Sequence, residues 1–483
     1  MPETRFVALV IVSVGALLAL ARLVRLPPSV TLFAGGLLSV LLPGPLPPLR
    51  VDPLIVLGMI LPPLLYAGVT DLSPAVLRWA AWRGVLAGAL WSLGLTAACA
   101  FAASLLLPGL DPVACMAIGV AAAIAEPRLL TETGLSRHLP RTLSDGLSAQ
   151  LATAPLIGVS LSLLVAKSVG GPAPGLQTIA WTLARDASLG AAAGVALGLA
   201  MAALRRRLDH PPTEAALSVA TPFAAAAIGE GMGISPIAVL IAAGLTIAAR
   251  HTDPATGESL ASPETRLLLR DLWRALNEVL TGALFFLMGR ALPEALQSPL
   301  PWMTLAVAAA ALLALCWAVQ FGISWAALAM PSAPATPREG GGRVPAWQAA
   351  ILLAASAGRS VIALAVALAL PAAAGGAPYA ARDAVIAVTA VLVIASALIQ
   401  WPLLPRLLAW ARPDGAAEAD REAALAAEAT AAIPADRPED GHRRLRALRE
   451  TDSIGDAALH DGEAALALRA RAAEVSGQVP KRH

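Results

Sequence analysis

The sequence predicts an all-α membrane protein that crosses the bilayer many times. Of its 483 residues, 57% are hydrophobic and only 14% are charged, whereas soluble domains carry about a quarter charged residues. Apolar runs of about 20 residues, the length that crosses a hydrocarbon core as a helix, recur along most of the chain. These runs are rich in alanine, leucine and glycine, which is typical of closely packed helices, and they lack the roughly ten-residue alternation of a membrane β-barrel.

We expect about thirteen membrane-spanning helices, which together make a polytopic membrane domain. The first apolar run follows Met1–Arg5 and lacks a convincing cleavage site, so we expect a retained helix and not a signal peptide. The expected spans are 6–22, 29–43, 52–70, 82–107, 112–126, 146–166, 177–204, 213–230, 236–249, 272–292, 302–330, 346–370 and 382–408.

The loops on one side of the expected membrane carry most of the basic residues. Arginines of these loops include the run Arg205-Arg206-Arg207, whereas the opposite loops hold little beyond Arg5, Arg50, Lys167 and Arg382. Because basic loops stay in the cytoplasm, we expect the amino terminus outside and the carboxyl terminus inside the inner membrane of a bacterial-type cell.

A change of composition divides the chain into two parts. Residues 1–411 form the expected membrane domain, and residues 412–483 form a charged, alanine-rich tail that is expected in the cytoplasm. Segments 422–431 and 462–475 of the tail favour helix. We expect the tail to be solvated and partly disordered, and a regulatory or dimer-contact role stays open.

The motifs of several other protein classes are missing. The sequence has no phosphate-binding loop, zinc-protease motif or nucleophile elbow, so we expect neither an enzyme nor a cofactor. Cys99, Cys115 and Cys316 lie in or beside apolar runs without paired spacing, and we expect them to be packing residues and not metal ligands. No basic patch with interleaved aromatic residues suggests nucleic acid.

Several segments, in order and spacing, resemble one transporter family. LPPLLY at 61–66 is similar to the family's third-helix LPPLLF motif, and Glu126 with Pro127 stands where the family has Asp-Pro. Further matching segments are 213–292, 358–371 and 399–405. Together they cover residues 1–410 and resemble the monovalent cation:proton antiporter family, which includes bacterial and eukaryotic sodium/proton exchangers.

The resemblance implies the sodium/proton-antiporter fold, which has two inverted repeats of six helices each. The seventh expected span, residues 177–204, joins the two repeats. In such carriers two discontinuous helices cross near the middle of the membrane and form the binding site. The run 112–126 is short and ends at Glu126, and the run 346–370 is broken at 356–360. We expect these two segments to be the crossed helices.

Glu126 and Arg359 are charges expected at membrane depth, where they need compensation. The ends of broken helices carry partial charges that such side chains would neutralise. For Arg359 this structural role is the expected one, because a guanidinium does not titrate usefully. For Glu126 a structural role and a proton-carrying role both stay open.

The resemblance also exposes what is absent. The family carries a Glu-Ser-x-x-Asn-Asp motif on its sixth helix, and laid on this sequence the motif falls on Leu147, Ser148, Ala149, Gln150, Leu151 and Ala152. Only the serine is kept. An acid expected on the third helix is replaced by Ala67. The carboxylate that binds either a cation or a proton is therefore missing from its usual place.

A second absence matches the first. The family pairs the motif's glutamate with an arginine on the eleventh helix, but residues 302–330 contain no charged residue, and Gln320 stands near the expected position. Removing one partner of a buried ion pair costs several kcal/mol, whereas replacing both partners can be neutral. Leu147 with Gln320 therefore indicates a stable, altered site.

Three polar groups remain near the expected pocket: Ser148, Gln150 and Thr153. Their neutral oxygens can solvate sodium or potassium without holding a proton. Ser148 and Thr153 can equally bond to the preceding helical turn, which is the common behaviour of such hydroxyls in membrane helices.

Two functional hypotheses follow. The first is a secondary transporter that exchanges monovalent cations for protons and serves pH homeostasis, with Glu126 as the remaining titratable group. The second is a relative that no longer couples cations to protons and acts as a facilitator for another solute or as a non-transporting sensor. The expected partners are a monovalent cation, a proton and the lipid bilayer, and the resemblance implies a homodimer.

Overall fold

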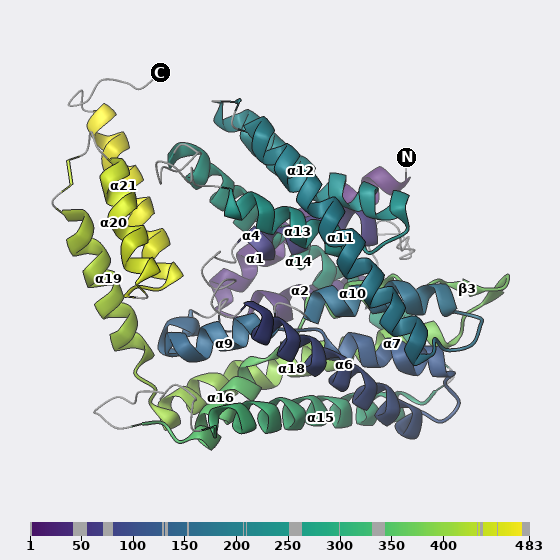
Figure 1. Ribbon diagram of the computed structural model, residues 1–483. Helices are drawn as coiled ribbons and strands as arrows, with labels where there is room; N and C mark the ends of the chain where they lie inside the picture. The colour runs from purple at the N-terminus through teal and green to yellow at the C-terminus, as the bar shows by residue number, and fades with distance from the viewer. Residues whose placement is uncertain are drawn as a thin grey trace.

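The computed structural model is almost entirely helical (Figure 1). It describes residues 2–41, 56–70, 81–127, 130, 134–151, 154–205, 207–208, 210–250, 263–298, 300–330, 343–431, 433–434, 438–451 and 453–475. Within these residues, six helices are long and apolar enough to cross a membrane, and shorter apolar helices accompany them. The predicted all-α polytopic class is confirmed, and the number of thirteen crossings stays a prediction.

The helices form two groups of similar order around a linking helix, α11 (Leu176–Arg205). The first group comprises α1 (Pro2–Val24), α2 (Pro28–Leu41), η1 (Val56–Ile60), α4 (Leu61–Thr70), α6 (Ala81–Leu106), α7 (Pro112–Ala123), η2 (Leu135–His138), α9 (Arg141–Leu151) and α10 (Ala154–Ser168). The second comprises α12 (Pro211–Met232), α13 (Pro236–Ala249), α14 (Pro263–Ala295), α15 (Trp302–Leu328), α16 (Ala346–Ser356), α17 (Val361–Leu368) and α18 (Ala381–Ala411).

The two expected interruptions are present and they meet. α7 is followed by the two-residue strand β1 (Ala125–Glu126), and β2 (Gly358–Arg359) separates α16 from α17. The two strands pair antiparallel, with Ala125 opposite Arg359 and Glu126 opposite Gly358. A second short pair, β3 (Ala373–Ala374) with β4 (Ala377–Pro378), makes a hairpin between α17 and α18. The crossed discontinuous helices of the expected fold are thus confirmed.

Glycines bring the linking helix α11 against α13. Gly190, Gly194 and Gly198 follow one face of α11 at intervals of four and are buried. A Cβ atom on Gly194 would collide with the Val239 carbonyl oxygen and lie 2.6 Å from the Ala242 Cβ. The two helices therefore approach through their backbones, as small residues allow in membrane proteins.

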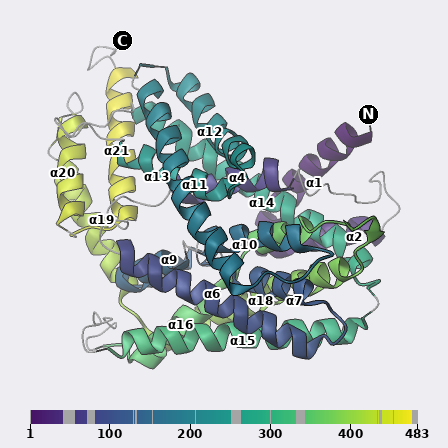
Figure 2. The same ribbon diagram turned by 45° about the vertical axis from the view of Figure 1, so that its right-hand side comes forward.

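The described residues of the charged tail form three helices, and two of these contain the segments 422–431 and 462–475 that favour helix in the sequence. They are α19 (Gly415–Ala431), α20 (Pro438–Glu450) and α21 (Asp456–Val475), and they lie side by side at one edge of the molecule (Figures 1 and 2). They bury a small apolar cluster of their own that consists of Ala426, Leu445, Ile454, Ala458 and Leu466. This cluster is the physical reason for the order, because composition alone does not reveal which apolar residues meet.

The glycine contact of α11 gives a prediction about stability. We expect Gly194→Val to destabilise the protein by about 1–3 kcal/mol, because the new side chain overpacks the contact with α13. The unfolding temperature of the detergent-solubilised protein measures the loss. Gly322→Val on α15 is the control, since a Cβ atom there meets nothing within 4 Å. Equal losses in both variants would mean that the effect is helix propensity and not the close approach.

Candidate functional site

The first interrupted segment begins with α7, and capping residues define both ends of this helix. Asp111 accepts the Ala114 N–H at 2.9 Å, and Pro112 occupies the first turn, where its missing N–H costs nothing. The Tyr379 hydroxyl donates to the other Asp111 carboxylate oxygen at 2.9 Å. Burial, together with that carboxylate, raises the pKa of Tyr379 above its usual value. At the far end, Ile124 adopts an extended conformation and the helix stops.

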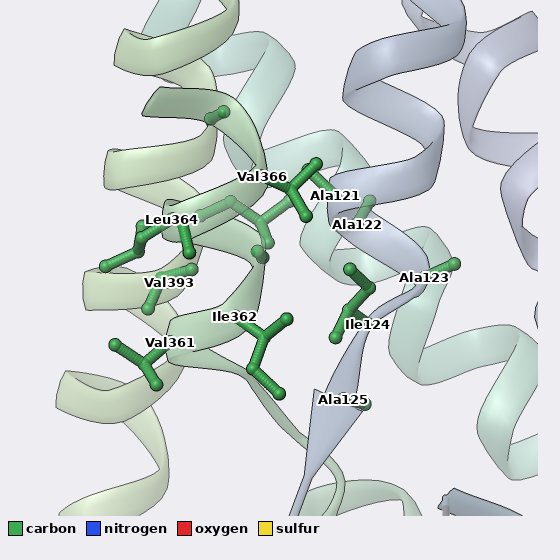
Figure 3. Packing of buried hydrophobic residues seen from close by; sticks show 14 of the residues in the cluster. Ala121, Ala122, Ala123, Ile124, Ala125, Val361, Ile362, Leu364, Val366 and Val393 are labelled. Atoms are coloured by element: carbon green, nitrogen blue, oxygen red, sulfur yellow. The ribbon is translucent and has the colours of Figure 1, made fainter. Parts of the chain in front are cut away.

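The second interruption is closed tightly around β2. Ser360 caps α17 by accepting the Ile362 N–H at 3.0 Å. Gly358 has no room for a side chain, because a Cβ atom would lie 2.8 Å from Gln400 Oε1 and 3.2 Å from the Glu126 carbonyl oxygen. The Ser360 N–H donates to the Ile124 carbonyl at 3.1 Å and extends the contact between the segments. Apolar residues of α17 and of the end of α7 surround this crossing (Figure 3).

Arg359 joins the ends of both half-helices. Its guanidinium Nη1 donates to the Ala122 carbonyl near the end of α7, and its Nη2 donates to the Ala357 carbonyl at the end of α16, at 2.8 Å. The side chain is only 6% exposed. Helix carboxyl ends carry partial negative charge, so the guanidinium lies where two such ends converge.

Glu126 lies on the other strand of the crossing. Its backbone pairs with Gly358, and the residue is half-buried. It lies three residues after the last residue of α7 and precedes Pro127. The crossing thus contains one residue that keeps its charge, Arg359, and one that is able to exchange a proton, Glu126.

Two further residues that support the crossing come from α18, and the sequence did not single them out for this role. Ser396 Oγ accepts the Arg359 N–H at 3.2 Å, and Gln400 Nε2 donates to the Ala355 carbonyl at 2.7 Å. Both residues are buried. They are four residues apart in the stretch 390–405, which is otherwise apolar, and this spacing places them on one face of the helix. The pattern was the signal in the sequence that could have identified them.

Two amide side chains, Gln150 and Gln320 (the amide pair), lie in contact beside the crossing. Gln320 on α15 is fully buried, and its Nε2 donates to Gln150 Oε1 on α9 and to Ser324 Oγ, each at 3.2 Å. The structure therefore brings Gln150 and Gln320 together, residues that are 170 positions apart. Ser324 joins them one turn further along α15 and was not expected.

Two positions of the family's motif, those of its glutamate and its asparagine, are apolar and buried in this chain. Leu147 is 2% exposed and Leu151 is 3% exposed, one turn apart on α9. Ser148 on the same helix is half-buried. Ala152 and Thr153 lie outside the described residues, and for Ala67 only the helical backbone of α4 is described.

Two of the three cysteines meet next to the crossing. The sulfur atoms of Cys99 on α6 and Cys316 on α15 are 3.7 Å apart, and Cys316 Sγ is also 3.7 Å from the Ala122 carbonyl oxygen that binds Arg359. Both residues are fully buried. Cys316 precedes Gln320 by one helical turn, so α15 presents a thiol and an amide to the centre of the molecule.

Comparison with known proteins identifies the family of the chain and several relatives. A family model described as "Sodium/hydrogen exchanger, transmembrane" matches residues 9–410. Uncharacterized Na(+)/H(+) exchangers of Mycobacterium bovis and Mycobacterium tuberculosis are each 26% identical over 410 residues, which is 82% of this chain and 72% of theirs. The Na(+)/H(+) antiporter NhaP of Pseudomonas aeruginosa is 26% identical over 325 residues, which is 59% of this chain and 70% of that protein.

A solved structure has the same fold. The sodium proton antiporter MjNhaP1 from Methanocaldococcus jannaschii superposes with a TM-score of 0.65 at 13% identity, and the match covers 85% of this chain and 99% of that one. At this identity the likeness concerns the fold alone.

The contact between α9 and α15 gives a prediction about the altered site. We expect Leu147→Glu to destabilise the protein by about 3–5 kcal/mol, because it buries a carboxylate without a cation. Adding Gln320→Arg is expected to recover much of this loss, since Gln320 reaches Gln150, which lies one turn from Leu147 on α9. Unfolding temperatures of the two single variants and the double variant measure the coupling.

The single variant Gln320→Arg serves as the second reference, since it buries an unpaired guanidinium. If the double variant loses as much stability as the two single variants together, positions 147 and 320 do not form a pair.

Proposed function

Because the chain belongs to the sodium/hydrogen exchanger family, we propose that it is a secondary active transporter that exchanges a monovalent cation for protons across a membrane. The family and its solved relative support cation/proton antiport in general. The observation that carries the proposal for this chain is the crossing itself. Two half-helices end there beside Glu126 and Arg359, which is the arrangement in which carriers hold ions at mid-membrane.

We assign the proton to Glu126. A carrier couples two ions most simply when both compete for one titratable group, and such a group works best when its pKa lies near the working pH. Leu147 and Ala152 stand where the family resemblance implies the two acids of the sixth-helix motif. Glu126 is an acid on the crossing itself, next to the break in α7.

The cation, in this proposal, is solvated by neutral oxygens. Gln150 and Gln320 supply amide oxygens, and Ser324 and Ser148 supply hydroxyls on the two helices beside the crossing. Thr153 is the remaining candidate. Neutral oxygens bind sodium or potassium without holding a proton, so in this proposal they help to hold the cation while Glu126 is the group for which the cation and the proton compete.

A second candidate function rests on the same apolar face of α9. If the buried Leu147 and Leu151 mean that proton competition has been lost, the protein is a facilitator of another solute or a non-transporting sensor. A fold is compatible with several functions because function depends on the site. Proton flux that is coupled to a cation gradient distinguishes the two candidates.

We further propose an inner-membrane location, with the amino terminus outside, the tail in the cytoplasm and a homodimer as the assembly. The arginine bias of the loops supports the orientation.

Changing Glu126 tests the proposed coupling. We expect Glu126→Gln to abolish proton movement driven by a sodium, potassium or lithium gradient in proteoliposomes, because glutamine binds no proton. The change keeps the size of the side chain. Glu278→Gln is the matched control, since Glu278 is an exposed acid of α14 that pairs with Arg22 at 3.3 Å. Full coupled exchange in Glu126→Gln would show that another group carries the proton.

Labelling tests the proposed orientation. A cysteine introduced at Ser298 is expected to react with a membrane-impermeant maleimide on intact cells, whereas one at Gly341 is not. The three native cysteines are buried, so the parent protein gives the background level of labelling. Reaction of the Gly341 variant on intact cells would contradict the proposed orientation and indicate the opposite one.

A further inference from the structure

Helix α6 turns a face with two hydroxyl groups toward α15. The sulfur atoms of Cys99 on α6 and Cys316 on α15 are 3.7 Å apart, and this contact identifies the faces through which the two helices meet. Thr96 and Ser92 precede Cys99 by three and seven residues. These intervals place both hydroxyls on the same face of α6 as the cysteine.

The facing side of α15 carries polar groups at the matching level. Gln320 and Ser324 follow Cys316 by one and two helical turns. α6 and α15 pack against each other and run in opposite directions (Figures 1 and 2). The residues that precede Cys99 therefore lie alongside the residues that follow Cys316, and the two hydroxyls of α6 face the polar side chains of α15.

Three oxygen atoms of this interface have no hydrogen-bond partner in the part of the chain that the structure describes. They are Ser92 Oγ, Thr96 Oγ1 and Gln320 Oε1. Their residues are 0%, 5% and 0% exposed, respectively. A buried polar atom without a partner raises the free energy of the folded protein. A bound group from outside the chain would remove this cost.

The amide of Gln320 is oriented by its two donors. Its Nε2 donates to Gln150 Oε1 on α9 and to Ser324 Oγ, each at 3.2 Å, so both N–H groups are used. Exchanging the nitrogen and the oxygen would place two acceptors, Gln320 Oε1 and Gln150 Oε1, against each other. The carbonyl oxygen is therefore the end of the amide that is left for a ligand. Because α9 also packs against α6, Gln150 closes a third side of the interface.

The chemistry of these groups selects a small monovalent cation. Gln320 Oε1 only accepts, so its partner has to be positive or a donor, whereas the two hydroxyls both accept and donate. A partly hydrated cation satisfies all of them, because the ion contacts the oxygens and its water accepts the hydroxyl hydrogens. α6 and α15 contain no acid, and protein sites for divalent cations rely on carboxylates.

We propose that Ser92 and Thr96 of α6 complete the cation site of the carrier, opposite Gln320 and beside Gln150. The site then lies between α6, α9 and α15, and a sodium or potassium ion in it is held by neutral oxygens from three helices. This inference rests on the proposed transport function, since it names further ligands for the transported cation. Cation binding is measurable without transport, so the two are tested separately.

The decisive variant is Ser92→Ala combined with Thr96→Val in the full chain, which removes both hydroxyls. Equilibrium binding of radioactive sodium and of radioactive rubidium, a potassium analogue, to the purified protein measures the affinity. We expect the dissociation constant of the bound ion to rise about ten-fold or more, because two contacts with a charge are lost. The matched control is Ser162→Ala combined with Thr221→Val, whose hydroxyls donate to carbonyls of their own helices. We expect the control to bind like the parent.

The unfolding temperature separates a ligand role from a structural role. With choline as the cation of the buffer, we expect the decisive variant to be at least as stable as the parent, because it removes two buried groups that lack partners. Replacing choline by sodium or potassium at constant ionic strength is expected to stabilise the parent and the control more than the decisive variant. Thr96→Ser keeps a hydroxyl and is expected to bind the ion like the parent.

Each other result decides against the site or against the transport function. Unchanged affinity in the decisive variant would exclude the two hydroxyls as ligands, even if cation/proton exchange in proteoliposomes is intact. Lower stability of this variant in choline would show that the hydroxyls serve packing. A parent that binds neither ion would leave water as the occupant of the interface. Weaker binding in the decisive variant of a protein that exchanges no cation for protons in any variant would uphold the site and refute the proposed function.

Discussion

Two helices stop inside the membrane region of this protein, and the carbonyl groups at their ends need a positive partner that keeps its charge. Arg359 is that partner, because it donates to the Ala122 carbonyl of α7 and to the Ala357 carbonyl of α16. A lysine carries a compact charge on a flexible stem, whereas the planar guanidinium reaches two acceptors at once. Ser396 and Gln400 of α18 bind two further backbone groups of the break, the Arg359 N–H and the Ala355 carbonyl.

The rest of the centre is built around this fixed charge. Gly358 allows the strands of the crossing to meet, and alanines at the end of α7 let α17 pack closely against it. Beside it, the ion pair that the family resemblance implies has been replaced on both sides, by Leu147 and by Gln320. A double replacement leaves no unpaired charge in the low-dielectric interior. The altered centre is therefore compatible with a stable protein, and its polar groups are neutral amides and hydroxyls.

The folded tail adds a connection that the membrane domain does not need for its own packing. Arg141 is part of α9, but its partners Glu418 and Glu422 come from the tail. α9 thus carries both Gln150 and the residue that contacts the tail. Any change at the amino end of α9 is transmitted along a rigid element to Gln150, about two and a half turns away.

The sequence by itself determined the class of the fold and the places where helices break. Apolar runs define the spans because every backbone group in lipid has to be satisfied within a helix, and the breaks at 124–126 and 357–360 follow from short or interrupted runs. It also indicated Glu126, Arg359 and Gln150 as polar groups of the centre. Only the tertiary structure decided which groups meet: Gln150 with Gln320, Arg359 with two helix ends, and Arg141 with Glu422. These contacts join residues far apart in the chain, and neither hydropathy nor local spacing specifies how separate helices face each other.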